Sequence, residues 1–172
     1  MAFTHDTELC LQAAVDLVNL EELSVGSVDD FYVRWGYTSP HDRSEAELAQ
    51  VAALVPRLRA MLLAPRDEAA ALVNAMLAES HALPQLARHE PVDWHVHVAP
   101  PGAPLATWIA AESAFAMIDV IRDDEMSRLQ VCADDDCDDI VLDLSRNRSK
   151  RFCSVTCGNR NAVAAYRARA RN

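Results

Sequence analysis

The fold of this chain depends most on residues 129–161, which read LQVCADDDCDDIVLDLSRNRSKRFCSVTCGNRN. This segment holds four cysteines in two close pairs that are separated by fifteen residues, namely Cys132, Cys137, Cys153 and Cys157. Paired thiols at such a spacing suit a tetrahedral Zn²⁺ site, in which the Zn–S distances are about 2.3 Å. Because no fifth ligand accompanies them, we predict one closed, structural Zn²⁺ site per chain with these four thiols as its ligands.

The residues around the two pairs predict a small finger. Residues 129–131 lead into the first pair, which we place on a knuckle turn, and residues 140–144 and 150–152 are expected to form a hairpin across residues 145–148. Residues 155–171 are rich in Ala and Arg and predict a helix. Cys153 and Cys157 are four residues apart, so both can point the same way from the first turn of that helix. Knuckle, hairpin and helix together predict a treble-clef-like zinc finger with four cysteine ligands.

Five cysteines are present, and four of them lie in this finger. In a reducing cytosol a cluster of this kind binds metal more often than it forms disulfides. A redox dithiol pair and an iron–sulfur cluster are the alternatives. Cys10 stands apart within an apolar helical pattern, and we predict a buried free thiol at this position.

The charge of the chain is divided unevenly along its length. The net charge of −10 combines −18 over residues 1–145 with +8 over residues 146–172, which contain no acidic side chain. Such an asymmetry indicates two roles, and a basic segment of this kind favours contact with DNA. The alternatives are a basic tail docked on the acidic body of the same chain, or a basic helix presented to the acidic surface of a partner protein.

Nine residues are candidates for nucleic-acid contact. They are Arg146, Arg148, Lys150, Arg151, Asn159, Arg160, Arg167, Arg169 and Arg171. Arg160, Arg167 and Arg171 recur at near-helical spacing and predict a helix along a groove, with the other basic residues on phosphates. Asn159 suits either a base contact or a brace for the zinc turn. Four thiolates around Zn²⁺ carry a formal charge of −2, so basic residues near the site also have a structural role available to them.

Residues 1–125 predict a helical domain with a small antiparallel sheet, and residues 126–172 form the finger. Alanine is common and glycine scarce, which favours helix. Helices are expected over residues 7–23, after Ser44, after Pro65 and over residues 104–123, and short strands over residues 86–89 and 93–98. The predicted fold class is therefore α+β and mostly helical.

Local patterns refine this domain. Ser44 and Glu47 predict a capping box that opens a helix, and Pro56 predicts a kink or break within that helix. Residues 24–39 are interpreted as an irregular loop or short strand that packs through its aromatic rings. Tyr32, Trp35 and Tyr37 of this loop could line a pocket, although core packing explains them equally well.

The sequence favours a role other than catalysis. His95 and His97 form a His-x-His, but on an alternating strand Trp94 and Val96 would face the core and leave both histidines on the polar outer face. No phosphate-binding glycine loop and no Gly-x-Ser-x-Gly motif occurs. We therefore expect no enzymatic activity.

Two further classes are not expected. The chain contains no run of about 18 apolar residues, so no membrane span is predicted. Its first residues contain acids and a histidine where a secretory signal needs basic and then apolar residues. These features favour a cytoplasmic protein.

Residues 145–152, SRNRSKRF, followed by residues 153–160, CSVTCGNR, resemble the CGNR zinc-finger family. Members of this family join the finger to an N-terminal helical domain, the ABATE domain, and are described as stress-induced transcription regulators. Residues 15–19, VDLVN, and the helix before the finger resemble the ABATE domain more loosely.

The resemblance implies a zinc-dependent transcription regulator. The finger would contact DNA, and the N-terminal domain would sense a small-molecule or protein effector. Because the acidic body repels the same duplex, a homodimer or a second DNA-binding partner is expected. The alternative is a zinc-stapled protein–protein interaction module without direct DNA binding.

Overall fold

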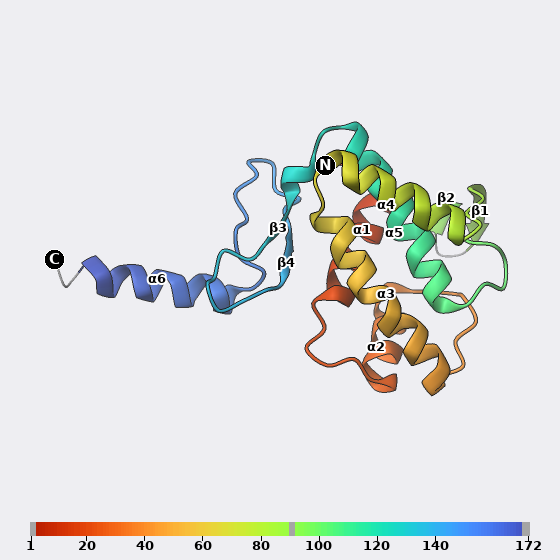
Figure 1. Ribbon diagram of the computed structural model, residues 1–172, viewed down its shortest axis with the longest axis horizontal. Helices are drawn as coiled ribbons and strands as arrows, with labels where there is room; N and C mark the ends of the chain where they lie inside the picture. The colour runs from red at the N-terminus through yellow and green to blue at the C-terminus, as the bar shows by residue number, and fades with distance from the viewer. Residues whose placement is uncertain (1–2, 90–91, 170–172) are drawn as a thin grey trace.

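The computed structural model describes residues 3–89 and 92–169. Within these residues the chain forms six α-helices and two antiparallel two-stranded sheets (Figure 1). The helices are α1 (His5–Val18), α2 (Val25–Trp35), α3 (Glu45–Leu63), α4 (Arg66–Glu79), α5 (Leu105–Arg122) and α6 (Val155–Arg169). The sheets pair β1 (Gln85–His89) with β2 (Val92–His97) and β3 (Leu129–Val131) with β4 (Ile140–Leu142). The predicted α+β, mostly helical class is confirmed.

Helix α5 is the centre of the helical body. It packs against α1, α3 and α4, and Leu105, Ile109 and Met117 are fully buried in the main core. A second, smaller cluster lies on another side of α5, where Trp108 and Ala111 pack with residues at the end of β2. Because α5 is covered on several sides, its apolar residues extend around the helix beyond a single stripe.

Helix α3 begins as predicted but does not break. The Ser44 hydroxyl accepts a hydrogen bond from the Glu47 backbone N–H, at 3.1 Å. The reciprocal half of the predicted capping box is absent, because the Glu47 carboxylate lies against His41 and the Asp42 backbone N–H instead. The helix continues through Pro56, so a break is excluded, and the kink given as its alternative stays a prediction. Its buried apolar face stabilises the helix against the loss of one backbone hydrogen bond.

The prediction of an irregular segment at residues 24–39 is wrong, because most of it is helix α2. Ser24 and Ser27 form a capping box at its start, and Gly36 ends it with a left-handed φ of 66°. Val28 and Phe31 face the main core. Helix α1 correspondingly ends at Val18, earlier than the predicted residue 23.

The β1–β2 hairpin has the predicted strands, and Val96 packs against the second cluster as predicted, but Trp94 and the histidines lie otherwise. Trp94 is 64% exposed, whereas His95 and His97 are half-buried. The His97 ring lies edge-on to the ring of Trp108, with centroids 5.2 Å apart. The histidine face therefore turns toward the body because it covers an aromatic residue of α5, and the prediction that Trp94 is in the core is wrong.

Strand β4 joins the finger to the body. Ile140 and Leu142 belong to the main core, whereas Val141 packs with Cys132 and Cys157. Alternate side chains of one strand thus face two different clusters. At the end of α1, the Asn19 amide donates to the Ile140 carbonyl and accepts from the Ile140 N–H, both at 2.8 Å.

The predicted hairpin between residues 140–144 and 150–152 is wrong, because β4 pairs with β3. The Asp143 carboxylate explains the difference: it accepts hydrogen bonds from the backbone N–H groups of Ser145 and Lys150, both at 2.8 Å. These bonds close residues 144–149 into a loop. Residues 150–152 then dock beside β3, where the Ala133 N–H donates to the Arg151 carbonyl at 2.9 Å.

Candidate metal centre and nucleic-acid interface

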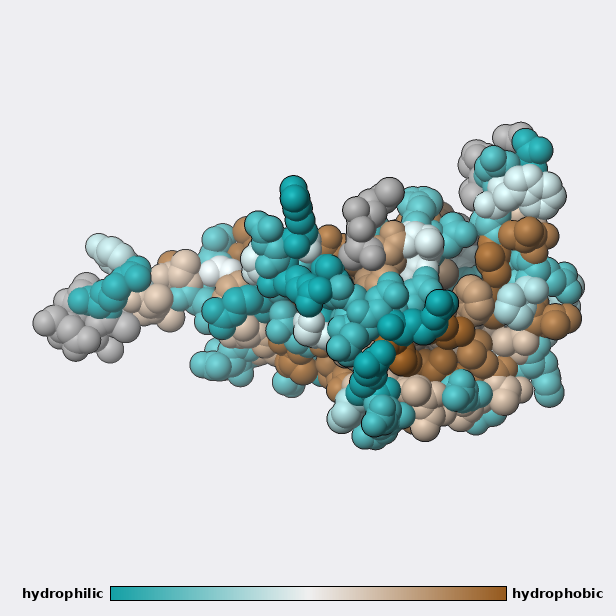
Figure 2. Space-filling view, turned by 90° about the horizontal axis from the view of Figure 1, so that it is seen from above, coloured by the Kyte–Doolittle hydropathy of each residue, from teal (hydrophilic) through white to brown (hydrophobic). Residues whose placement is uncertain are grey.

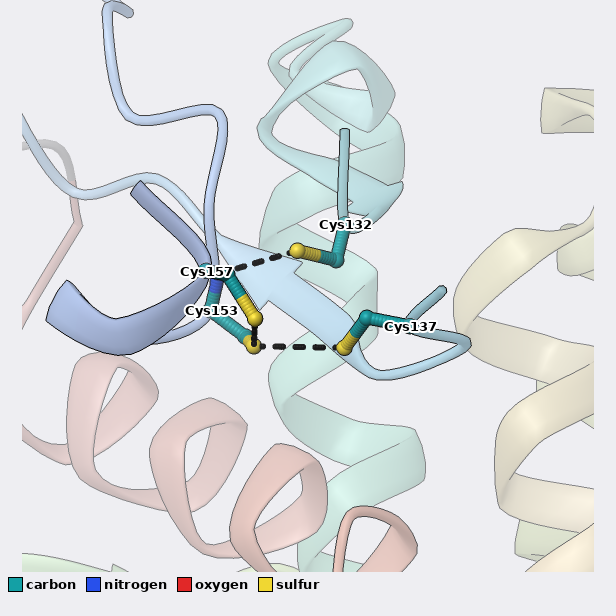
Figure 3. Close-up of side chains that lie close together, drawn as sticks. All are labelled: Cys132, Cys137, Cys153 and Cys157. Carbon is teal, nitrogen blue, oxygen red and sulfur yellow. Dashed lines mark hydrogen bonds between the residues drawn. The ribbon is translucent and has the colours of Figure 1, made fainter. Parts of the chain in front are cut away.

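The four cysteines converge at the base of α6. Cys132 and Cys137 lie in the loop between β3 and β4, Cys153 lies just before α6, and Cys157 lies in its first turn (Figure 3). All four sulfur atoms lie within 4.8 Å of one another. The Sγ atoms of Cys137 and Cys153 are 3.5 Å apart, and those of Cys153 and Cys157 are 3.6 Å apart. The four thiols that the sequence predicts to come together therefore lie together in the structure.

These distances fit a metal centre and exclude a disulfide between the measured pairs. A tetrahedron with Zn–S distances of about 2.3 Å has sulfur atoms roughly 3.8 Å apart. A disulfide would bring two sulfur atoms to about 2.05 Å, and all five cysteines of the chain are free. Four thiolates fill the coordination of Zn²⁺, so the chain carries one structural zinc site in which bound Zn²⁺ would link the β3–β4 loop to α6.

The surroundings of the thiols affect them differently. Burial, and next a hydrogen bond involving Asp139, raise the pKa of the Cys153 thiol. Burial also acts to raise the pKa of Cys132, but hydrogen bonds from the backbone N–H groups of Cys153 and Asp134 bring it below its ordinary value. The Cys153 N–H lies 3.4 Å from the Cys132 sulfur. Backbone donors of this kind stabilise a thiolate, the form in which cysteine binds zinc.

An ion pair supports the site from its outer side. Arg160 Nε donates to the buried Asp134 carboxylate at 2.6 Å, and Arg160 Nη2 donates to the Cys157 sulfur at 3.5 Å. Burial acts to raise the pKa of Asp134, but the Arg160 guanidinium lowers it below its ordinary value. Arg160 therefore offsets the charge of the thiolates and orients one ligand, as outer-shell groups do at metal sites.

The other candidate nucleic-acid residues divide into two groups. Arg148 pairs with Glu125 at 2.6 Å, and the Lys150 ammonium donates to the Leu142 carbonyl at 3.3 Å. In the part of the chain that the structure describes, four arginines form no ion pair and are exposed, namely Arg146, Arg151, Arg167 and Arg169. Arg171 lies outside the described residues.

Asn159 is exposed, whereas Asn161 donates its side-chain amide to the Cys157 carbonyl at 3.1 Å. The bracing role that the sequence offered for Asn159 therefore belongs to Asn161. Sequence reasoning also missed Asp134 and Asp143 as structural groups. The Asp134 carboxylate accepts a hydrogen bond from the Asp136 backbone N–H, and the Asp143 carboxylate accepts one from the Ser145 backbone N–H. A bond to the backbone two residues further on is a local turn typical of aspartate, and this residue type was the available signal.

Helix α6 extends away from the helical body (Figure 1). The view from above shows the same projection (Figure 2). Every side chain from Ala162 to Arg167 is exposed, including Val163 at 47% and Tyr166 at 68%. The helix is 15 residues long, and isolated helices of about this length are marginal in water. An exposed basic helix of this kind is therefore suited to docking on a partner.

Comparisons with known families match both parts of the chain. The CGNR zinc finger family matches residues 128–170. The ABATE family, whose description is "Putative stress-induced transcription regulator", matches residues 11–124. A search of curated proteins found no match. Within the described residues, no helix is long and apolar enough to cross a membrane.

Proposed function

The chain belongs to the ABATE family and ends in a CGNR zinc finger, and on this premise we propose that it regulates transcription through contact of α6 with DNA. In this proposal the zinc site fixes the start of α6, and the helical body holds the finger and senses an effector. The four-thiol coordination leaves no open position for a substrate, which favours regulation over catalysis.

The exposure of α6 is the observation that carries this proposal. The side chains of Arg167, Arg169, Val163 and Tyr166 are exposed, and the helix extends away from the helical body (Figure 1). An α-helix of these dimensions fits the major groove, where arginine reads guanine and apolar groups contact the thymine methyl. The absence of acidic side chains in residues 146–172 favours a polyanion as the surface that receives it.

The exposed arginines of the finger belong to the same proposed interface. Arg146 lies in the loop after β4, and Arg151 precedes Cys153, so both can reach phosphates beside a groove that holds α6. Arg148 and Arg160 are already paired with Glu125 and Asp134. With the four exposed arginines that form no ion pair among the described residues, the slope of log K against log salt is expected near −3 to −4.

A titration of fluorescent duplex DNA tests the proposal. The zinc-loaded full chain is titrated into random duplex fragments at about 50 and 200 mM salt, and anisotropy is measured. Binding should fall steeply with salt. The double variant Arg167→Ala, Arg169→Ala should reduce the affinity at least tenfold, because it removes two cations from α6.

The matched control is Arg57→Ala with Arg122→Ala, two exposed arginines on helices of the body. The control should bind DNA as the wild type does. Failure of the zinc-loaded wild type to bind at the lower salt would refute DNA contact and favour the interaction-module alternative. Equal losses in the two double variants would refute the assignment of the contact to α6.

A further inference from the structure

The helical body contains a cavity between α1, the end of α2, β2 and α5. Its volume is 170 Å³, below the roughly 300–1,000 Å³ typical of pockets for drug-sized ligands. Three large aromatic side chains line it, namely Trp35 at the end of α2, Tyr37 in the loop that follows, and Trp108 of α5. A cavity of this size and lining suits a small organic molecule with an apolar portion.

The charged groups of the cavity are acidic. Asp6 of α1 and Glu112 of α5 line it, and none of its lining residues is Lys or Arg. Among residues 3–89 and 92–169, no group donates a hydrogen bond to the Glu112 carboxylate or forms an ion pair with it. Burial, and next the charge of Asp6, raise the pKa of Glu112 from 4.5 to about 7. A cation in the cavity would favour the ionised form of the buried Glu112 carboxylate and offset the charge of Asp6.

Two histidines of β2 also line the cavity, and they hydrogen-bond to each other and to the backbone. His95 Nδ1 lies 2.7 Å from the Asp93 carbonyl, which can only accept, so Nδ1 carries a proton. His95 Nε2 lies 2.8 Å from His97 Nε2, a distance at which one nitrogen donates and the other accepts.

One buried donor also remains available. Trp108 is only 7% exposed, and its indole Nε1 has no hydrogen-bond partner within the described parts of the chain. A buried donor without a partner costs on the order of 1–3 kcal/mol. A water molecule held beside a bound ligand would accept a hydrogen bond from this group.

We propose that this cavity binds a small organic ammonium ion, with the cation at Glu112 and Asp6 and the apolar portion against the rings of Trp35, Tyr37 and Trp108. Aromatic faces attract organic cations, and the attraction grows when the cation is removed from water. This inference rests on the effector-sensing part of the proposed function, and it names the site and the ligand class.

Trp35 connects this cavity to the finger. It also lines a second cavity of 530 Å³, whose other walls include Asn19 of α1 and Lys150 of the finger. The Trp35 indole N–H donates to the Asp16 carboxylate at 2.8 Å, and Asp16 lines the second cavity as well. A ligand that moves the Trp35 ring would therefore alter the surface on which the finger rests.

Calorimetric titration of the zinc-loaded full chain with three matched probes tests the proposal. The probes are 2-phenylethylammonium, neutral 2-phenylethanol and anionic phenylacetate. We expect the ammonium probe to bind at least tenfold more tightly than either of the others. Glu112→Gln should weaken its binding about tenfold or more, whereas the exposed control Glu68→Gln on α4 should leave it unchanged.

Asp6→Asn provides a second test if Glu112→Gln does not fold, and it should also weaken the binding of the ammonium probe. Equal affinities for the three probes would overturn the proposal. So would ammonium binding that is unchanged in both variants, or no binding of any probe at about 10 mM.

The DNA titration described above separates this inference from the proposed function. Ammonium binding that changes DNA affinity supports both the site and its regulatory role. Ammonium binding with unchanged DNA affinity supports the site and refutes regulation of DNA contact through it. DNA binding by a chain that binds no ammonium probe refutes the site alone.

Discussion

The body and the finger are held together by different physical means. The body buries a continuous cluster of aliphatic and aromatic side chains from α1 to α5, whereas the cluster specific to the finger has Cys132, Val141 and Cys157 as its buried members. Burial of apolar surface stabilises the first. The second is too small to fold on apolar burial, so it depends on metal binding.

The finger and the body are in contact through strand β4. Ile140 and Leu142 belong to the core of the body, Val141 belongs to the finger, and Asn19 of α1 bonds the backbone of Ile140 on both its N–H and its carbonyl. A change in the body can therefore reach the finger through packed groups.

Metal removal should have the largest effect. Structural Zn²⁺ contributes about 10–16 kcal/mol in zinc-finger peptides. Chelation should therefore unfold α6 and the cysteine loops while α1 to α5 remain folded. Far-UV circular dichroism should lose only a minor part of the helical signal, because α6 has 15 residues. Cys10→Ser, which changes a thiol outside the site, should leave the zinc content unchanged.

A substitution that creates a cavity in the core of the body should have the next largest effect on stability. Leu58 of α3 is fully buried, and Leu58→Ala should reduce the free energy of unfolding by about 2–5 kcal/mol. Urea denaturation measures this loss, and zinc content should stay at one ion per chain. Val33→Ala, at a residue that is 70% exposed, should change stability by less than about 0.5 kcal/mol.

Asn19→Ala should weaken the junction. It removes two hydrogen bonds and leaves the Ile140 backbone groups without their partner, at a cost of about 1–3 kcal/mol. Hydrogen exchange should become faster in β3 and β4 than in α4. Uniform destabilisation of all helices, with no local change in β4, would contradict the role of Asn19 as a link.

Arg160→Ala should affect the metal but not the body. Loss of an outer-shell partner typically lowers metal affinity about 10–100-fold, and competition with a chromophoric chelator measures the change. Arg167→Ala lies on the same helix without contact to the thiols or Asp134, and should keep wild-type zinc affinity. Equal zinc affinity in both variants would show that the Arg160–Cys157 contact is unimportant.

The stability of the body and that of the finger should change in opposite directions as the pH rises. Because the folded pKa of Glu112 is raised to about 7 from 4.5, its contribution to stability is present below about pH 4.5 and is lost as pH rises through 7. Relative to Glu112→Gln, the wild-type body should lose on the order of 1–3 kcal/mol between pH 5 and pH 8. The finger should respond oppositely, since acid protonates its thiolates and releases zinc.

The sequence predicted the elements that depend on local chemistry. The zinc ligands, the start of α3 at Ser44, α4 and α5 follow from spacing, capping and apolar periodicity. Helix α2 differs from the predicted loop although Ser24, Ser27 and Gly36 suit the ends of a helix, because the aromatic residues between them have low helix propensity. That error reflects a weak intrinsic preference that burial of Val28 and Phe31 overrides.

The remaining differences from the sequence prediction involve side-chain contacts that periodicity and charge patterns do not specify. The partner of β4 was misassigned because the Asp143 carboxylate ties up the loop that would otherwise form a turn. The exposure of Trp94 depends on His97 covering Trp108. The pairing of Arg160 with Asp134 spans 26 residues. Alternation and charge counts do not contain such information.

Hydrogen exchange of α6 tests the central claim most directly. The zinc-loaded chain is measured alone, with duplex DNA and with poly-glutamate of equal charge. We predict fast exchange beyond the first turn of α6 in the free chain, and protection by DNA but not by poly-glutamate, with α1 to α5 unchanged. Protection by poly-glutamate alone, or an α6 that is already protected in the free chain, would contradict the proposal that this helix is presented to DNA.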